Sequence, residues 1–374
     1  MREAWDRAQK TLCRDGAGVS DVPDAAERAD LVARARELVA GQGTLLFLTL
    51  FGSSLYGTRW PGHSDLDVRG IFLPREPATC REEAERQKCL HASTAPERKR
   101  NASTDTDLDL VPLERWLCVM LPRGDTGALD LLFAPSHAAC TLVRHPALQE
   151  VFAHPLQFLN LASGTACRSY CLGQGNTYGL AGTRLGALCR VYHLLRETHF
   201  PAGTRVRDIA REIVAQAAAP DYCSLTEEGG LLLAGQEHMG ATRIELVLER
   251  LEKPLCGHLQ RMEAARRNEG VDWKALSHAV RALRQQEELL TTGRLVYPLA
   301  CREELVAIKQ GRLDFASVEE RIVEGLIRLE ALRARALAGT LRLAGLPGTQ
   351  VRLSDQALWQ CCQAIRKRCL ETSC

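Results

Sequence analysis

The sequence predicts an α+β protein: a short mixed sheet with flanking helices, followed by a mostly α-helical domain. Strand-like segments, either apolar runs or alternating patterns, occur almost only before about residue 140. Helical periodicity dominates after that point. A chain of 374 residues is long enough for two hydrophobic cores. We therefore expect one domain over residues 1–139 and a helical domain over residues 140–374.

The first domain begins with a helix and two strands. Residues 29–42 have apolar side chains at helical spacing and are followed by Gly43. Residues 44–51, TLLFLTLF, form a short apolar run between glycines, which indicates a buried strand. Residues 64–74 alternate between polar and apolar side chains and predict a second strand.

A long polar segment separates the second strand from the third. Residues 75–105 are rich in Arg, Lys, Glu, Ser and Thr without a period, and we expect a loop with a short helix near residues 81–87. Residues 105–113 alternate again and predict the third strand. A helix over residues 113–121 follows, and residues 128–135 fit a helix or a strand, of which we favour a helical turn.

The second domain shows almost no strand signal. Its periodic segments predict helices over residues 141–162, 184–199, 205–218, 241–268, 273–292, 301–310, 315–338 and 354–370.

Composition excludes several classes of protein. The net charge is +2 and aromatic residues make up 5%, which argues against a strongly charged nucleic-acid binder or a broad base-stacking platform. No apolar run approaches the roughly 20 residues that span a bilayer, and the N-terminus lacks a signal-peptide core. We expect a cytoplasmic protein without a membrane partner; the sequence gives no oligomeric state.

Fifteen cysteines are scattered irregularly and include no CxxC pair. This pattern indicates buried free thiols rather than a disulfide framework or a cysteine-ligated metal.

Acidic residues recur on one predicted face of the sheet. Alternation places Asp65 and Asp67 on the same side of the second strand, and Asp107 and Asp109 on one side of the third. Carboxylates gathered on one face repel each other unless cations bind them. Oxygen ligands of this kind suit Mg²⁺, and a pair of such ions promotes in-line displacement at phosphorus.

A Gly-Ser pair directly follows the first strand. Gly52 lets the backbone approach a ligand closely, while the Ser53 hydroxyl and neighbouring N–H groups suit the phosphates of a nucleotide. The combination of strand, Gly-Ser, Asp-Leu-Asp and a third acidic strand predicts a nucleotide and metal site.

This pattern resembles the DNA-polymerase-β-like nucleotidyltransferase superfamily. GSSLYGTRWPGHSDLDVRGIFLP is similar to the motif of its RNA-repair-associated (RlaP-like) group of predicted nucleotidyltransferases. DLDLVPLERWL resembles that group's third strand and helix, and TGALDLLFAP a later segment, with Asp130 where the group usually has Glu. WKALSHAVRALRQQEELLTTG and ELVAIKQG resemble its C-terminal segments.

The resemblance implies a polymerase-β-like fold and a set of roles. Gly52 and Ser53 would bind the triphosphate of an NTP such as ATP. Asp65 and Asp67 would bind two Mg²⁺ ions, for which Mn²⁺ can substitute. Asp107 takes the position of the third carboxylate, which binds the catalytic metal and helps to deprotonate the attacking hydroxyl; Asp109 is its rival.

Other candidates keep a structural alternative. Tyr56 would stack on the nucleotide or close the turn. Arg69, on the aspartates' side of the strand, would neutralise a phosphate or pair with Asp67. Lys274 and His278 share a helix face with Arg281 and would contact the triphosphate or an RNA backbone, or else form a solvated face.

Weaker candidates are more readily explained as surface or interface groups. They are Arg59, His63, the basic stretch 97–103, Tyr192, His193 and Arg196.

The expected function is therefore transfer of a nucleoside monophosphate from an NTP to a hydroxyl, with release of pyrophosphate. The resemblance implies RNA repair, with a tRNA or damaged RNA end as acceptor. The alternatives are nucleotidylation (AMPylation) of a protein or small molecule, and a non-catalytic nucleotide or RNA sensor.

Overall fold

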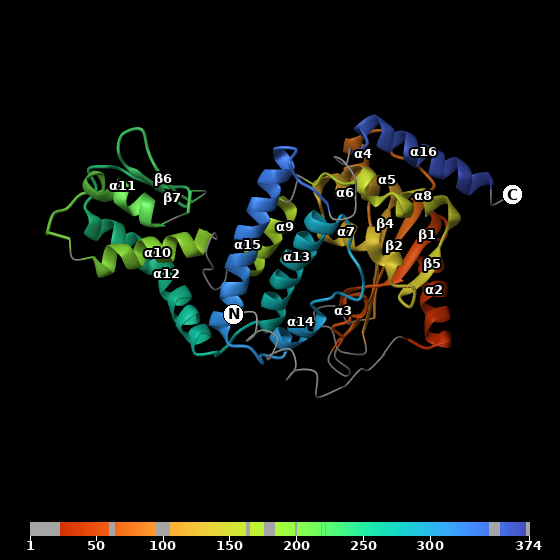
Figure 1. Cartoon of the computed structure of the whole chain (residues 1–374), viewed down its shortest axis with the longest axis horizontal. Coiled ribbons are helices and arrows are strands. Elements are labelled where there is room, and N and C mark those ends of the chain that lie inside the picture. The colour runs from red at the N-terminus through yellow and green to blue at the C-terminus, as the bar shows by residue number, and fades with distance from the viewer. Residues whose placement is uncertain are drawn as a thin grey trace. The chain divides into compact units, whose positions relative to one another are not determined.

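The computed structural model is a mixed α+β fold, as predicted from the sequence (Figure 1). It describes residues 23–59, 64–94, 105–161, 165–175, 184–198, 200–217, 219–220, 222–343 and 352–371.

Contacts divide the chain into two compact units. Unit 1 comprises Met1–Cys167, Gln285–Val306 and Ala331–Cys374, and unit 2 comprises Arg168–Arg284 and Ala307–Glu330. Unit 1 therefore takes part of its structure from the second half of the chain. The domain boundary predicted after residue 139 concerns independent folding and stays a prediction.

Unit 1 is built on a five-stranded mixed sheet of order β3-β4-β2-β1-β5. The central strands β2 and β4 are parallel, and every other neighbouring pair is antiparallel. The strands are β1 (Gly43–Leu50), β2 (Leu66–Pro74), β3 (Leu90–Ser93), β4 (Thr106–Pro112) and β5 (Thr141–Arg144). Because β2 and β4 run in the same direction, the segment between them crosses from one end of the sheet to the other.

Short helices flank this sheet. Helix α2 begins with a capping box, in which the Asp24 carboxylate accepts from the Glu27 N–H and the Glu27 side chain accepts from the Asp24 N–H. The other helical segments of the unit's first part are α3 (Gly52–Tyr56), α4 (Arg81–Arg86), α5 (Leu113–Arg115), a π-helical turn (Trp116–Met120), α6 (Leu121–Arg123), α7 (Thr126–Phe133) and α8 (Gln149–Ala153), with α2 spanning Ala25–Val39.

The C-terminal helix α16 (Asp355–Glu371) is fastened to this unit by a buried ion pair. Arg366 Nη2 lies 2.8 Å from Oε1 of Glu114, whose side chain is only 2% exposed. Arg366 Nη1 also donates to the Pro74 carbonyl, at 2.8 Å. A buried carboxylate needs such partners, since its desolvation is otherwise uncompensated.

Helices dominate the rest of the chain, as predicted. A buried cluster in unit 2 joins α10, α11 and α12 to a small antiparallel sheet of order β6-β7-β8. The elements are α9 (Thr165–Gly175), α10 (Arg184–Glu197), α11 (Val206–Ala217), β6 (Cys223–Leu225), β7 (Leu231–Leu233), β8 (Gln236–His238), α12 (Ile244–Arg266), α13 (Trp273–Thr292), α14 (Arg302–Lys309) and α15 (Phe315–Leu337).

Two predictions about elements were wrong. Residues 141–162 were expected to form one helix, but Thr141–Arg144 is strand β5, which pairs with β1, and α8 follows as a short helix. Residues 90–93, expected to be loop, form β3 on β4. Both strands have four residues at a sheet edge, so pairing with a neighbouring strand, and not local periodicity, determines them.

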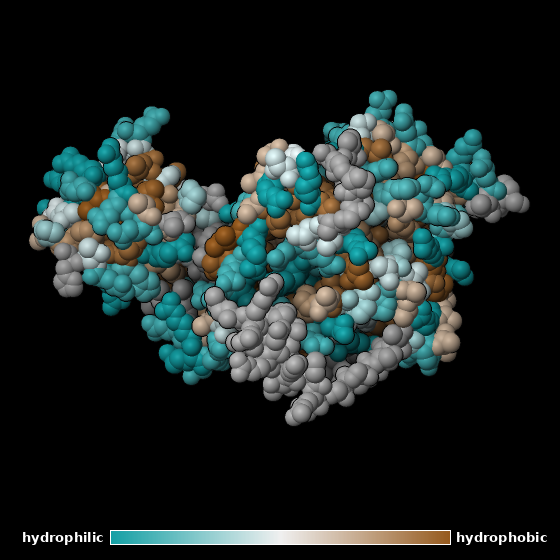
Figure 2. All heavy atoms as spheres, viewed as in Figure 1, coloured by the Kyte–Doolittle hydropathy of each residue, from teal (hydrophilic) through white to brown (hydrophobic). Residues whose placement is uncertain are grey.

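The sulfur chemistry is as expected. Of the twelve cysteines whose side chains are described, each is a thiol outside any disulfide, and most are buried. None of the helices in the described part of the chain combines the length and apolar character that a bilayer crossing requires. Hydrophilic residues cover most of the visible surface in Figure 2, with hydrophobic side chains scattered among them.

Candidate functional site

Three carboxylates meet on the face of the sheet in unit 1. Asp65 directly precedes β2, Asp67 lies within it, and Asp107 occupies the paired position on β4. One oxygen from each side chain lies within 4.8 Å of the others, and all three residues are partly buried. Parallel pairing of β2 with β4 produces this meeting, because Asp67 and Asp107 stand side by side in register.

The donor set fits a hard divalent cation. Carboxylate oxygens are the ligands that Mg²⁺ and Mn²⁺ take in proteins, and close carboxylates are stabilised by a cation between them. The three aspartates that could hold a metal are thus the three that the sequence predicted as metal ligands.

Gly52 lies against this acidic cluster. Its φ is +55°, in the region that favours glycine, and a Cβ at this position would collide with Asp67 Oδ2. The Phe51 N–H donates to the Asp67 carbonyl at 2.8 Å, which ties the entry of α3 to β2. The Gly-Ser turn and the Asp-Leu-Asp strand therefore form one local structure. Ser53 follows at the start of α3, and its carbonyl accepts from the Thr58 N–H at 2.9 Å.

Asp109 lies in a different environment from Asp107. Its Oδ1 is 2.7 Å from His91 Nδ1, and its Oδ2 is 3.5 Å from Arg69 Nε. In the register of the sheet, Asp109 on β4 has two neighbours. His91 on β3 is on one side and Arg69 on β2 is on the other. The row next to that of Asp67 and Asp107 is therefore His91–Asp109–Arg69, with the Asp109 carboxylate between the imidazole and the guanidinium.

Arg69 is on the aspartates' side of β2, as alternation predicted. Arg69 forms an ion pair with Asp109, whereas Asp67 was the partner considered from the sequence. The guanidinium carbon also lies 4.4 Å from the centre of the Phe51 ring, a cation–π distance.

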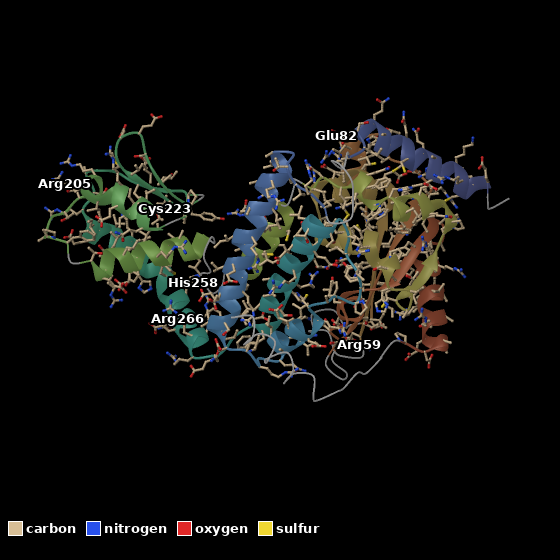
Figure 3. All side chains as sticks on the ribbon, in the orientation of Figure 1. Arg59, Glu82, Arg205, Cys223, His258 and Arg266 are labelled. Carbon is tan, nitrogen blue, oxygen red and sulfur yellow. The ribbon has the colours of Figure 1, made fainter. Side chains whose placement is uncertain are left out.

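Tyr56 is buried at the end of α3. Its hydroxyl donates to Asp130 Oδ2 at 2.6 Å, and its ring packs edge-on against Phe51. These contacts correspond to the turn-closing alternative; stacking on a nucleotide stays a prediction. Arg59, labelled in Figure 3, follows α3 by three residues.

Lys274, His278 and Arg281 belong to α13 within unit 2. The His278 ring Nδ1 lies 3.5 Å from the Tyr170 hydroxyl, to which Arg281 Nη2 also donates at 3.5 Å. Burial, and then the nearby charges of Arg281, Lys274 and Lys309, lower the pKa of His278 to about 4. His278 is therefore neutral at physiological pH, and a nucleotide contact from it would be a hydrogen bond rather than an ion pair.

The weaker candidates of unit 2 have local partners. Tyr192 donates to Glu252 at 3.3 Å and accepts from Arg196, while His193 lies near Glu197. His63 and the basic stretch 97–103 lie outside the described residues.

Sequence reasoning missed two residues that the structure places near the predicted site. His91 lies in the polar segment that was expected to be loop, so no strand pattern indicated its face. Asp130 was noted only as a departure from a motif, yet it is 2% exposed and bonded to Tyr56. A carboxylate inside the apolar run LDLLF was the available signal.

The chain is similar to a phage protein in sequence and was compared with solved structures. No protein-family profile matches the sequence. A curated relative, the "uncharacterized 38.9 kDa protein in nrdC-mobD intergenic region" of enterobacteria phage T4, is 28% identical over 306 residues, covering 76% of this chain and 88% of its own length. A solved structure, a nucleotidyltransferase-like protein from Exiguobacterium sibiricum, matches at 12% identity over 84% of this chain and 77% of its own, with a TM-score of 0.24. A TM-score this low carries no argument about fold or activity.

Proposed function

We propose that this chain is a Mg²⁺-dependent nucleotidyltransferase. It moves a nucleoside monophosphate from an NTP to a hydroxyl acceptor, which we propose to be an RNA end. One observation carries the proposal: Asp65, Asp67 and Asp107 bring carboxylate oxygens within 4.8 Å of one another, directly beside a glycine turn that a Cβ would block.

Each residue has a role in this proposal. Asp65 and Asp67 would hold both metal ions, and Asp107 would hold the catalytic one. Bound Mg²⁺ would neutralise the triphosphate and lower the pKa of the attacking hydroxyl. Gly52 and Ser53 bind the β- and γ-phosphates, since the missing Cβ leaves room for close backbone approach.

The transfer itself is an in-line displacement. The acceptor oxygen forms a bond to the α-phosphorus, and the bond from that phosphorus to the bridging oxygen of the β-phosphate breaks. The hydroxyl proton passes toward Asp107, and pyrophosphate leaves with the electron pair of the broken bond. Positioning and charge neutralisation supply the rate enhancement, as in phosphoryl transfer generally.

The choice of Asp107 over Asp109 rests on their partners. Asp109 lies against His91 and Arg69, whereas Asp107 shares the acidic cluster. The roles of Lys274 and His278 stay predictions from the sequence.

The test is incubation with Mg²⁺, each of the four labelled NTPs, and a panel of tRNA, nicked RNA, protein and small-molecule acceptors. We expect label on an RNA end and one pyrophosphate per label, both absent in Asp67→Asn. Label on a protein would replace the RNA acceptor by a protein. NTP binding without incorporation on any acceptor would instead favour a nucleotide sensor.

A further inference from the structure

A buried carboxylate lies at the C-terminal end of α3, the helix that begins at Gly52. Asp130, in α7, is 2% exposed and accepts three hydrogen bonds. The donors are the Tyr56 hydroxyl at 2.6 Å on Oδ2, and the Tyr297 hydroxyl at 2.6 Å and Gln285 Nε2 at 2.7 Å on Oδ1. Gln285 Nε2 also donates to the Tyr297 hydroxyl, at 2.9 Å, so the donors are linked to each other.

The backbone reinforces this contact. The Leu299 N–H donates to the Tyr56 carbonyl at 3.2 Å. Gly57 ends α3 with φ +72°, and a Cβ on it would come within 2.8 Å of Pro298 Cβ. The C-terminal end of α3 is thus closed by residues 297–299, which belong to unit 1 although they are distant in the sequence.

Helix α3 needs such support. It has five residues, too few for a helix to be stable by its own hydrogen bonds. It begins with Gly52, beside Asp67, and ends with Tyr56, on Asp130. A displacement at Tyr56 would therefore be transmitted along little more than one helical turn to the residues beside the acidic cluster.

We propose that Asp130 is a positioning residue for the donor nucleotide: through the Tyr56 hydroxyl it holds α3 so that Gly52 and Ser53 keep their place beside Asp67. The inference rests on the proposed function for its consequence in catalysis. Asp130 itself touches no substrate, because it is buried under α3. Its loss weakens binding of the NTP and leaves the three metal-binding carboxylates in place.

The test compares substitutions at two buried acids of unit 1 that are equally exposed. The test variant is Asp130→Asn, and the matched control is Glu114→Gln. Each side chain is 2% exposed, but Glu114 bonds to Arg366 of α16 and not to α3. Both substitutions should lower Tm by a few degrees, since each removes a charge-assisted bond. Hydrogen exchange at the amides of Leu55, Gly57 and Thr58, measured without ligand, should accelerate about tenfold in Asp130→Asn alone.

Kinetics and metal binding complete the comparison. Asp130→Asn should raise KM for the NTP about tenfold with a smaller change in kcat, while Mn²⁺ binding measured without nucleotide stays as in the wild type. Tyr56→Phe, which removes only the hydroxyl, should reproduce the faster exchange. Equal exchange at α3 in Asp130→Asn and Glu114→Gln would overturn the inference.

The exchange measurement needs no catalytic activity. If wild type transfers no nucleotide, the proposed function fails while the positioning of α3 by Asp130 is still decided by exchange.

Discussion

Two regions of the molecule gather charges of one sign, and they accommodate the repulsion differently. In unit 1, the partly buried Asp65, Asp67 and Asp107 bring carboxylate oxygens within 4.8 Å of each other on one face of the sheet. In unit 2, burial, and then the positive charges of Arg281, Lys274 and Lys309, lower the pKa of His278 to about 4, so that this histidine loses its proton. The basic region contains its own means of reducing charge, whereas the acidic region is suited to an external cation.

Two buried acids of unit 1 differ from both of these regions. The buried acids Glu114 and Asp130 each face donors: Arg366 for Glu114, and two tyrosines and a glutamine for Asp130. Glu114 and Asp130 are each held by donors of the fold, whereas the three clustered aspartates bring their oxygens close enough to hold a metal ion together. The following predictions test this distinction.

The largest effect on activity should come from neutralising one carboxylate of the acidic cluster. Asp107→Asn should lower kcat/KM on the order of 10⁴-fold, because a ligand of the catalytic metal is lost. Asp109→Asn, on the same strand, removes only the partner of His91 and Arg69 and should cost about tenfold. Steady-state kinetics and Mn²⁺ titration measure both.

A larger loss in Asp109→Asn than in Asp107→Asn would reverse the assignment of the third carboxylate. Neither substitution should greatly change the free energy of unfolding, since both residues are partly exposed. Urea unfolding of both variants is the control.

The second largest effect, on stability, should come from breaking the ion pair of the buried acid Glu114. Arg366→Met leaves Glu114 buried without its cation and should lower the free energy of unfolding by about 3–5 kcal/mol. The neighbouring Lys367 is 78% exposed, so Lys367→Met should change it by less than about 0.5 kcal/mol. Denaturant unfolding measures both; similar values would show that the pair does not hold α16.

The smallest effect should come from the basic region. The pKa of His278 is lowered in the folded state, so between about pH 6.5 and pH 4 the unfolded chain binds more protons there than the folded chain. Because the folded-state pKa of His278 is the lower one, the free energy of unfolding has its full value above pH 6.5. It falls as the pH drops toward 4, by roughly 3 kcal/mol in total.

His278→Gln keeps a hydrogen-bonding side chain but cannot titrate. Urea unfolding at pH 7.5, 6.0 and 5.0 should show a flatter pH dependence for His278→Gln than for wild type, with carboxylate titration common to both. Parallel curves would mean that His278 is protonated in the folded protein like an exposed histidine.

The residues of the acidic cluster could be picked out from the sequence because their alternation along each strand is local. Alternation fixed the faces of Asp67, Arg69, Asp107 and Asp109, and the pairing of β2 with β4 completed the cluster. The edge strands Leu90–Ser93 and Thr141–Arg144 were missed because four residues contain too little pattern. The bonds from Tyr297 and Gln285 to Asp130 join residues more than 150 positions apart, so no local signal could indicate them.

Those distant bonds also bear on how the protein is made. Helix α3 leaves the ribosome early, but Tyr297 and Leu299, which close its end, follow roughly 240 residues later, a delay on the order of 10–50 s at usual synthesis rates. During that interval a nascent chain can pair β1 with β2 while Tyr56 and Asp130 lack their final partners. Under the proposed function, nucleotide binding should therefore arise only late in synthesis, once residues 297–299 have closed the end of α3.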